Sequence, residues 1–274
     1  MKFEQHLEIN HSDKTAVDAF EQSTELTRQA IKQAMTKGAV WLTRNKSTQR
    51  IRRANKPLKP GDELHLYFDP KVLEAQPQAA ILLADEDIYS IWAKPYGMLC
   101  QGSKWGDHCT INRWVEKNLE PQRPSFIVHR LDRAARGLII IAHQKKIAAY
   151  FSHLFQSRDI EKKYQALVEG CFPSELKLDS DIENKPALSH AKSIAYNSQT
   201  DQSLVEVTIS TGRKHQIRRH LSEAGFPIVG DRLYGQGNES SSDLCLTSVY
   251  LSFTSPVDGI KKIYTLPDHL KLTL

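Results

Sequence analysis

The sequence predicts an α+β fold, in which helices flank a mostly antiparallel central sheet and a small α/β unit precedes it. Segments with the two-residue period of strands are mixed with segments of helical spacing, without the regular alternation of a parallel α/β fold. The 274 residues suffice for one large core and a small second domain. Residues 70–80 hold two prolines among small or polar residues, as linkers do. We therefore expect one domain over residues 1–75 and another over residues 76–274.

Local patterns predict the elements of the N-terminal domain in order. Apolar residues at helical spacing predict a helix over 24–37 that ends at Gly38. A strand is expected to begin at Val40. After a Pro-Gly-Asp turn at 60–62, alternating residues predict a second strand over 63–68.

The larger domain shows both periods as well. Apolar runs and alternating segments predict strands, and apolar residues three and four apart predict helices. The strands are expected over 88–93, 137–142, 164–168 and 204–209, and the helices over 144–156 and 214–223.

Charge is concentrated in one part of the N-terminal domain. Residues 26–61 contain ten Lys or Arg and no Asp or Glu. Such a block repels itself unless a polyanion meets it, which predicts nucleic-acid binding; a solvated basic face is the alternative. The expected RNA contacts are Arg28, Lys32, Lys37, Arg44, Arg50, Arg52 and Arg53.

Several classes of protein are disfavoured. No run approaches the about 18 apolar residues of a membrane span, and residues 1–6 lack the apolar core of a signal peptide. The four cysteines are scattered in no zinc-binding pattern. We expect a cytoplasmic monomer with free thiols, no metal and no membrane association.

The most informative segment is His129-Arg130-Leu131-Asp132-Arg133, which lies just before the apolar run 137–142. A carboxylate at the head of a buried strand, flanked by positive charge, is unusual in a core; a surface ion-pair cluster is the alternative. Three further segments combine strand ends with polar residues. They are Lys94-Pro95-Tyr96-Gly97-Met98, Lys163-Tyr164-Gln165-Ala166, and residues 211–220, which continue to Gly230-Asp231.

In this order, over residues 81–256, these segments resemble the RluA-type pseudouridine synthase family. His129-Arg130-Leu131-Asp132 matches its catalytic signature, and residues 212–218 match another of its signatures. The resemblance implies a central sheet of the pseudouridine synthase type and isomerisation of uridine in RNA without a cofactor. Residues 37–40 and 58–64 resemble, in part, the alpha-L RNA-binding module.

The resemblance also implies roles for single residues. Asp132 would be the nucleophile, attacking either the ribose or the uracil ring. Arg218 would pair with Asp132, or alternatively bind phosphate. Tyr164 would stack on the uracil and accept the carbon-5 proton, the alternative being a core tyrosine. Other residues are expected to bind the substrate or to orient the loop and helix of the site. They are Arg130, His129, Lys94, Arg213, His215, Gln216 and Leu246.

The chain departs from the family pattern in two places. Ala135-Arg136 stands where Thr-Ser is usual, and Thr247 where histidine is frequent. Two other functions stay open: a non-catalytic RNA-binding or ribosome-assembly factor on the same fold, and a hydrolase with Asp132 as base. Ribosomal RNA is the favoured target, because of the basic domain, and transfer RNA is the alternative.

Overall fold

A computed structural model describes residues 1–10, 15–235 and 243–274. The chain divides into two compact units, one of residues 1–78 with 101–117, the other of residues 79–100 with 118–274. Segment 101–117 therefore lies with the first unit, although we had expected it in the larger domain. Its backbone explains this, because the Asp107 N–H donates to the Lys37 carbonyl over 3.0 Å. In the described part of the chain, no helix is long and apolar enough to cross a membrane.

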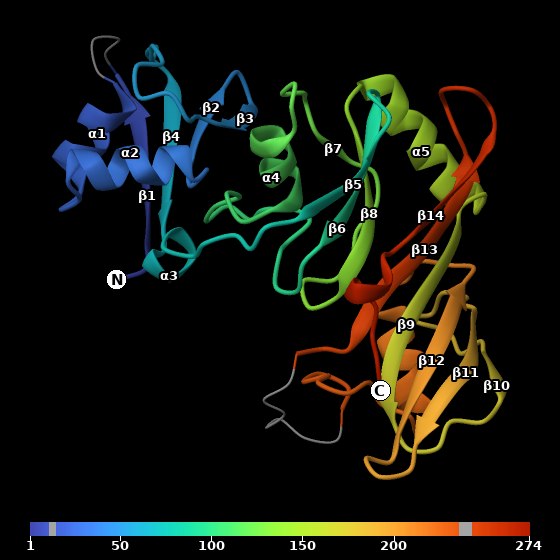
Figure 1. Ribbon diagram of the computed structural model, residues 1–274. Helices are drawn as coiled ribbons and strands as arrows, with labels where there is room; N and C mark the ends of the chain where they lie inside the picture. Colours follow the sequence, from blue (N-terminus) through green and yellow to red (C-terminus); the bar gives the residue numbers. More distant parts are fainter. Residues whose placement is uncertain (11–14, 236–242) are drawn as a thin grey trace. The chain divides into compact units, whose positions relative to one another are not determined.

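The first unit packs helices on an antiparallel sheet (Figure 1). Within the described residues, the sheet has four strands in the order β1 (Phe3–Ile9), β4 (Asp62–Phe68), β2 (Val40–Arg44) and β3 (Ser47–Arg50). The helices of this part of the chain are α1 (Ala16–Ser23), α2 (Arg28–Thr36), α3 (Pro70–Leu73) and α4 (Ile111–Asn118).

Apolar side chains join α1 and α2 to the sheet, with Phe20, Ile31 and Leu64 fully buried among them. Helix α2 starts later than predicted, because the Thr27 side chain accepts from the Ala30 N–H and caps it there.

The second unit is built on one large sheet, in which the described residues form ten strands. The path of the sheet is β10-β11-β12-β9-β13-β8-β6-β5, with β14 on β13 and β7 on β8. Every pairing is antiparallel except that of β13 with β8, so the predicted fold class is confirmed. The strands are β5 (Ile81–Asp85), β6 (Tyr89–Lys94), β7 (Phe126–Ile127), β8 (Arg136–Ala142), β9 (Glu161–Glu169), β10 (Glu175–Leu178), β11 (Ser189–Asn197), β12 (Gln202–Ile209), β13 (Leu246–Thr254) and β14 (Lys261–Thr265).

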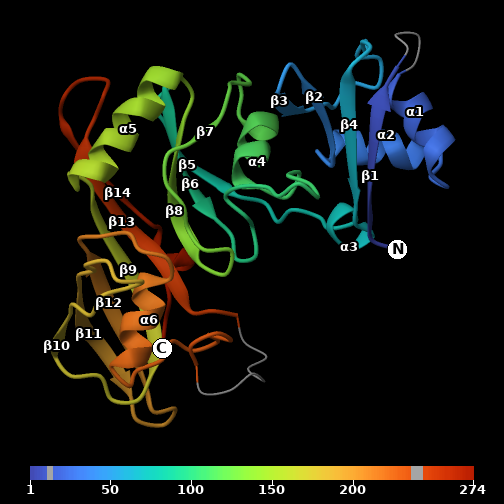
Figure 2. The same cartoon turned by 180° about the vertical axis from the view of Figure 1, so that it is seen from behind.

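Helices cover this sheet in two places. Helix α5 (Lys145–Ser157) buries Phe151 against Tyr89 and Phe253 of the sheet. Helix α6 (Gln216–Glu223) lies beside β11 and β12 (Figure 2), and its residues Gln216 and His220 both bond to the Ser189 hydroxyl of β11. A short 3-10 helix spans Asp268–Leu270.

The parallel contact between β8 and β13 depends on Gly137. Its φ is +105°, and a Cβ at this position would lie 2.1 Å from the Ser248 carbonyl oxygen. Only glycine tolerates both the backbone angle and the approach. Strand β8 begins shortly after Asp132, and β13 pairs on its other side with β9, which carries Tyr164. The contact between β8 and β13 therefore places the start of β8 next to the strand that pairs with Tyr164.

Candidate active site

Asp132 lies in the loop between β7 and β8, and that loop is tied to the one after β6. The Gly97 N–H donates to the Arg133 carbonyl over 2.9 Å. The Lys94 ammonium donates to the carbonyls of Pro95 and Met98 and reaches that of Arg133 at 3.5 Å. Lys94 is 1% exposed, and this burial lowers its pKa to about 8. Lys94 therefore holds two loops together and does not face the solvent.

Two residues of the α6 segment face the Asp132 carboxylate, which is 27% exposed. Arg218 Nη1 lies 3.6 Å from Oδ2, and His215 Nε2 lies 3.9 Å from Oδ1. Both distances are longer than a hydrogen bond. Arg218 thus lies near Asp132, but Asp132 is not its tightest partner.

That partner is Asp231, to which the sequence assigned no role. Arg218 Nε and Nη2 donate to its two carboxylate oxygens over 2.7 and 2.6 Å. Burial raises the pKa of Asp231, but the hydrogen bonds and positive charge of Arg218, together with the hydrogen bonds from the Leu233 and Tyr234 N–H groups, lower it overall. The available signal was a lone aspartate, Gly230-Asp231, in the segment after the basic helix.

Tyr164 lies on β9, directly opposite Ser248 of β13. It is 8% exposed, and burial, helped by the negative charge of Asp132, raises the pKa of its phenol well above the usual range. The side chain is therefore a neutral phenol near the carboxylate. Leu246 is buried two residues before Ser248 and pairs with Ala166.

His129 and Gln216 make contacts within the protein. His129 Nε2 accepts from the Ile140 N–H over 2.9 Å, and its ring stacks on Phe155 with centroids 4.6 Å apart. Desolvation, with the charge of Lys162, lowers the pKa of His129 to about 3.

The Gln216 amide is equally engaged: its oxygen accepts from the Thr211 hydroxyl and the Arg213 N–H, and its nitrogen donates to Leu188 and Ser189. Arg213 is half-buried and its Nε donates to the Pro186 carbonyl, whereas Arg130 is exposed.

The two departures from the family pattern meet in space. Arg136 and Thr247 are partners in the parallel pairing of β8 with β13. Arg136 Nε donates to Thr247 Oγ1 over 3.1 Å. The guanidinium of Arg136, at one position that departs from the family pattern, is therefore hydrogen-bonded to Thr247, at the other.

Four residues of the basic block, which was expected to meet a polyanion, form ion pairs within the protein. Arg28 Nη1 contacts Asp18 at 2.8 Å, and Arg44 holds both oxygens of Asp62. Arg52 contacts Asp107, and Arg50 Nη1 lies 3.5 Å from the same carboxylate. These acids lie outside the window 26–61, so its composition could not reveal them.

Arg50 and Lys37 of the block also donate hydrogen bonds to backbone carbonyls. Arg50 donates to the carbonyls of Gly38 and Ser103, and Lys37 donates to the Leu73 carbonyl. Lys32 and Arg53 are exposed and, among the described residues, have no ion pair. These two remain available to a polyanion.

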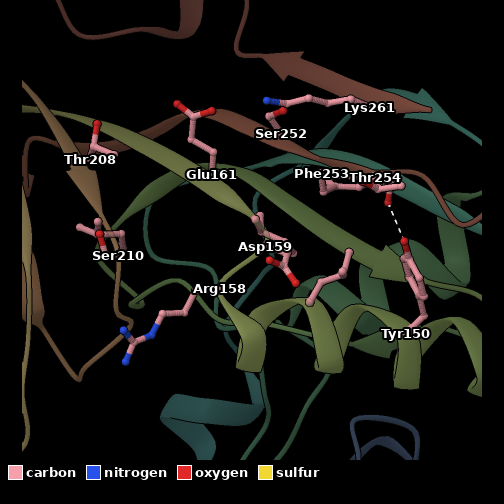
Figure 3. A pocket seen from close by; sticks show the side chains of 13 residues that line it. Tyr150, Arg158, Asp159, Glu161, Thr208, Ser210, Ser252, Phe253, Thr254 and Lys261 are labelled. Atoms are coloured by element: carbon pink, nitrogen blue, oxygen red, sulfur yellow. Dashed lines mark hydrogen bonds between the residues drawn. The ribbon is translucent and has the colours of Figure 1, made fainter. Parts of the chain in front are cut away.

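A separate pocket of about 780 Å³ lies where the end of α5 meets β9, β12 and β13 (Figure 3). Tyr150, Arg158 and Lys261 are among its lining side chains, and it shares no residue with the cluster around Asp132. Residues 1–10, 15–235 and 243–274 contain no group of three or more His, Cys, Asp or Glu that could hold a metal ion.

The chain is similar to known proteins in sequence and in structure. The profile of the RNA pseudouridylate synthase family matches residues 88–223. A protein of Chloroflexus aurantiacus, named an uncharacterized RNA pseudouridine synthase, is 30% identical over 239 residues, which cover 78% of this chain and 75% of that protein.

Two other relatives are also 30% identical. The ribosomal large subunit pseudouridine synthase C of Buchnera aphidicola matches over 66% of this chain and 59% of its own. The tRNA pseudouridine synthase C of Vibrio vulnificus matches over 54% and 70%.

Among solved structures, human RNA pseudouridylate synthase domain containing 1 has the same fold. The TM-score is 0.60 at 22% identity, over 71% of this chain and 86% of that one. The sequence match to the Chloroflexus protein over three quarters of its length, together with the matching family profile, confirms the predicted family and enzyme class. The chain belongs to the RNA pseudouridylate synthase family and is an isomerase.

Proposed function

We propose that this enzyme converts uridine to pseudouridine at specific positions of a structured RNA, with Asp132 as the nucleophile. The observation that carries the proposal is the partly exposed Asp132 carboxylate, which faces Arg218 and His215 near the neutral phenol of Tyr164. A nucleophilic carboxylate has to be charged, directed and accessible, and this cluster meets all three needs.

The reaction balances without an added reagent. The bond from ribose to N1 breaks, the base rotates, and a bond from ribose to carbon 5 forms. The proton lost from carbon 5 is matched by one gained at N1, so substrate and product are isomers. Asp132 can serve by attacking the ribose or the uracil ring, and both routes end with release of the carboxylate.

Tyr164 is better suited as a platform for the uracil than as the proton acceptor. Its burial and the nearby charge of Asp132 both disfavour the phenolate that would have to accept a proton. A neutral ring, in contrast, can pack against a base without any change of charge.

The remaining predicted site residues divide into two groups. Arg130 is exposed two residues before the nucleophile, so it is placed to fill the stack when the target base is extruded. Arg213 precedes His215 by two residues, and part of its side chain is accessible to RNA. Lys94, His129, Gln216 and Leu246 support the site from within, because their polar groups or side chains are engaged by the protein.

The first unit would supply RNA affinity, with residues 1–75 as an alpha-L-like module, and the second unit, residues 79–100 with 118–274, would supply the chemistry. A groove of about 540 Å³ on α2 is lined by Arg28, Lys32 and Lys37. With exposed Arg53, it offers positive charge to phosphates. We favour ribosomal RNA as target, with transfer RNA as the alternative; relatives named for each kind support both.

The test is to incubate the enzyme with total RNA from a strain lacking its gene and to sequence for new pseudouridines. The wild-type protein should introduce them at few positions, and Asp132→Asn should introduce none while retaining its RNA affinity. Binding without modification by the wild-type protein would favour the non-catalytic RNA-binding factor. Near-normal turnover by Asp132→Asn would refute Asp132 as nucleophile.

A further inference from the structure

We propose that the loop 231–234 positions both groups that face Asp132, with Asp231 directing Arg218 and Tyr234 directing His215. This inference rests on the proposed role of Asp132 as nucleophile. Both loop residues are positioning residues, because the groups that approach the Asp132 carboxylate belong to Arg218 and His215.

Asp231 determines which edge of the Arg218 guanidinium is left for the nucleophile. It binds the Nε and Nη2 edge over 2.7 and 2.6 Å, so Nη1 is the nitrogen that points to Asp132 at 3.6 Å. The Asp231 side chain is itself fully buried, and its Oδ1 also accepts from the N–H groups of Leu233 and Tyr234. The same carboxylate therefore orients the guanidinium and shapes the loop.

Asp231 also weakens the electrostatic interaction between Arg218 and Asp132. One guanidinium stands between two carboxylates, and the closer one, Asp231, takes most of its electrostatic interaction. Asp132 is therefore directed by Arg218 without being locked into a tight ion pair. A carboxylate that must form and later release a covalent bond benefits from that looser contact.

Tyr234 determines the tautomer of His215. Arg219 Nε, which can only donate, contacts the Tyr234 hydroxyl oxygen at 3.1 Å. The hydroxyl proton is then free for His215 Nδ1, at 2.9 Å. A neutral imidazole that accepts at Nδ1 carries its proton on Nε2, and Nε2 is the nitrogen that faces Asp132.

The backbone of His215 supports a functional placement. His215 has φ of 55° and ψ of 28°, in the left-handed region, which costs free energy for a residue with a side chain. It lies at the N-cap of α6 and makes no side-chain capping hydrogen bond. The ring is instead directed between Tyr234 and Asp132.

The experiment compares three variants by single-turnover rate at saturating RNA and by Kd for RNA. Asp231→Asn keeps the shape and removes the charge; Tyr234→Phe keeps the ring and removes the hydroxyl. Ser222→Ala is the control, because the Ser222 hydroxyl bonds to the Tyr234 carbonyl of the same loop over 2.6 Å and, among the described residues, forms no hydrogen bond with the side chain of Arg218 or His215. Thermal melting shows which variants are folded at the assay temperature.

Asp231→Asn should slow the rate about 10- to 100-fold, as expected for weakening one or two charged hydrogen bonds. Tyr234→Phe should slow it less, by about 3- to 10-fold, as expected for one neutral hydrogen bond. For both, Kd should change less than about twofold, and Ser222→Ala should retain the wild-type rate.

If Asp231→Asn fails to fold, Tyr234→Phe alone decides the result. Equal slowing by Ser222→Ala, or an unchanged rate in a folded Asp231→Asn or Tyr234→Phe, would show that the loop is merely structural and overturn the inference. Absence of pseudouridine with the wild-type enzyme would instead overturn the proposed function.

Discussion

Replacing Arg218 with lysine keeps the positive charge but removes the planar group that spans two carboxylates. The guanidinium uses three nitrogens, two toward Asp231 and one toward Asp132. A lysine carries its charge on a single ammonium at the end of a flexible chain, so it cannot contact Asp231 and face Asp132 at the same time. Arg218→Lys should therefore preserve local charge and lose the alignment of the nucleophile.

The magnitude follows from the hydrogen bonds that the substitution removes. An ammonium close to Asp231 replaces a two-pronged contact with one hydrogen bond and withdraws Nη1 from Asp132. Losing one hydrogen bond to a charged group costs about 1.5–3 kcal/mol. If that loss is expressed in the transition state, at about 1.4 kcal/mol per tenfold, the single-turnover rate falls about 10- to 150-fold.

The assay is pseudouridine formation in a single turnover at saturating RNA, with Kd measured separately. Kd for RNA should stay within about twofold of the wild-type value, because Arg218 is buried and a phosphate of the RNA cannot readily reach it. Arg232→Lys, at an exposed arginine nearby in the sequence, is the matched control and should keep its rate. If Arg218→Lys instead weakens RNA binding and leaves the saturated rate intact, Arg218 is a phosphate clamp and the reasoning fails.

Three other outcomes are expected. Gly137→Ala should lower the free energy of unfolding by about 2–4 kcal/mol in urea titrations, because its φ of +105° and the 2.1 Å approach to Ser248 both resist a Cβ; an unchanged midpoint would contradict this. The pKa of His129 is about 3 in the folded protein, below its ordinary value of 6.5. Between these two pH values the unfolded chain therefore binds a proton on His129 that the folded protein does not bind. The free energy of unfolding should thus fall as the pH drops through that range, by up to about 1.4 kcal/mol per pH unit. His129→Gln should reduce this pH dependence, and equal slopes for the wild-type protein and the variant would refute the role of His129. Replacing Lys32 and Arg53 with alanine should flatten the dependence of log affinity on log salt by about 0.7–0.9 per phosphate contact, whereas paired Arg28→Ala should change it less; the reverse order would exclude the exposed pair as RNA contacts.

The sequence alone predicted the strands and helices whose side chains repeat with a clear period. Strand β12 was predicted over 204–209 and spans 202–209, and helix α5 was predicted over 144–156 and spans 145–157. Such periods arise from the backbone geometry of a single element, so they can be read without knowledge of its neighbours. Strands β1 and β11 were not predicted. None of the β11 residues from 192 onward is buried, which weakens the alternation that marks a strand.

For the candidate site, the sequence supplied Asp132, Tyr164 and Arg218, because they fall within short ordered signatures. It could not supply the pairing of Arg218 with Asp231, thirteen residues apart along the chain. Nor could it show that Arg28 contacts Asp18, or that segment 101–117 packs with the first unit. A charge is matched by whichever opposite charge the fold brings within a few ångströms, and burial then decides how strongly they interact. Those distances exist only after the strands have paired, so the tertiary structure alone decided them.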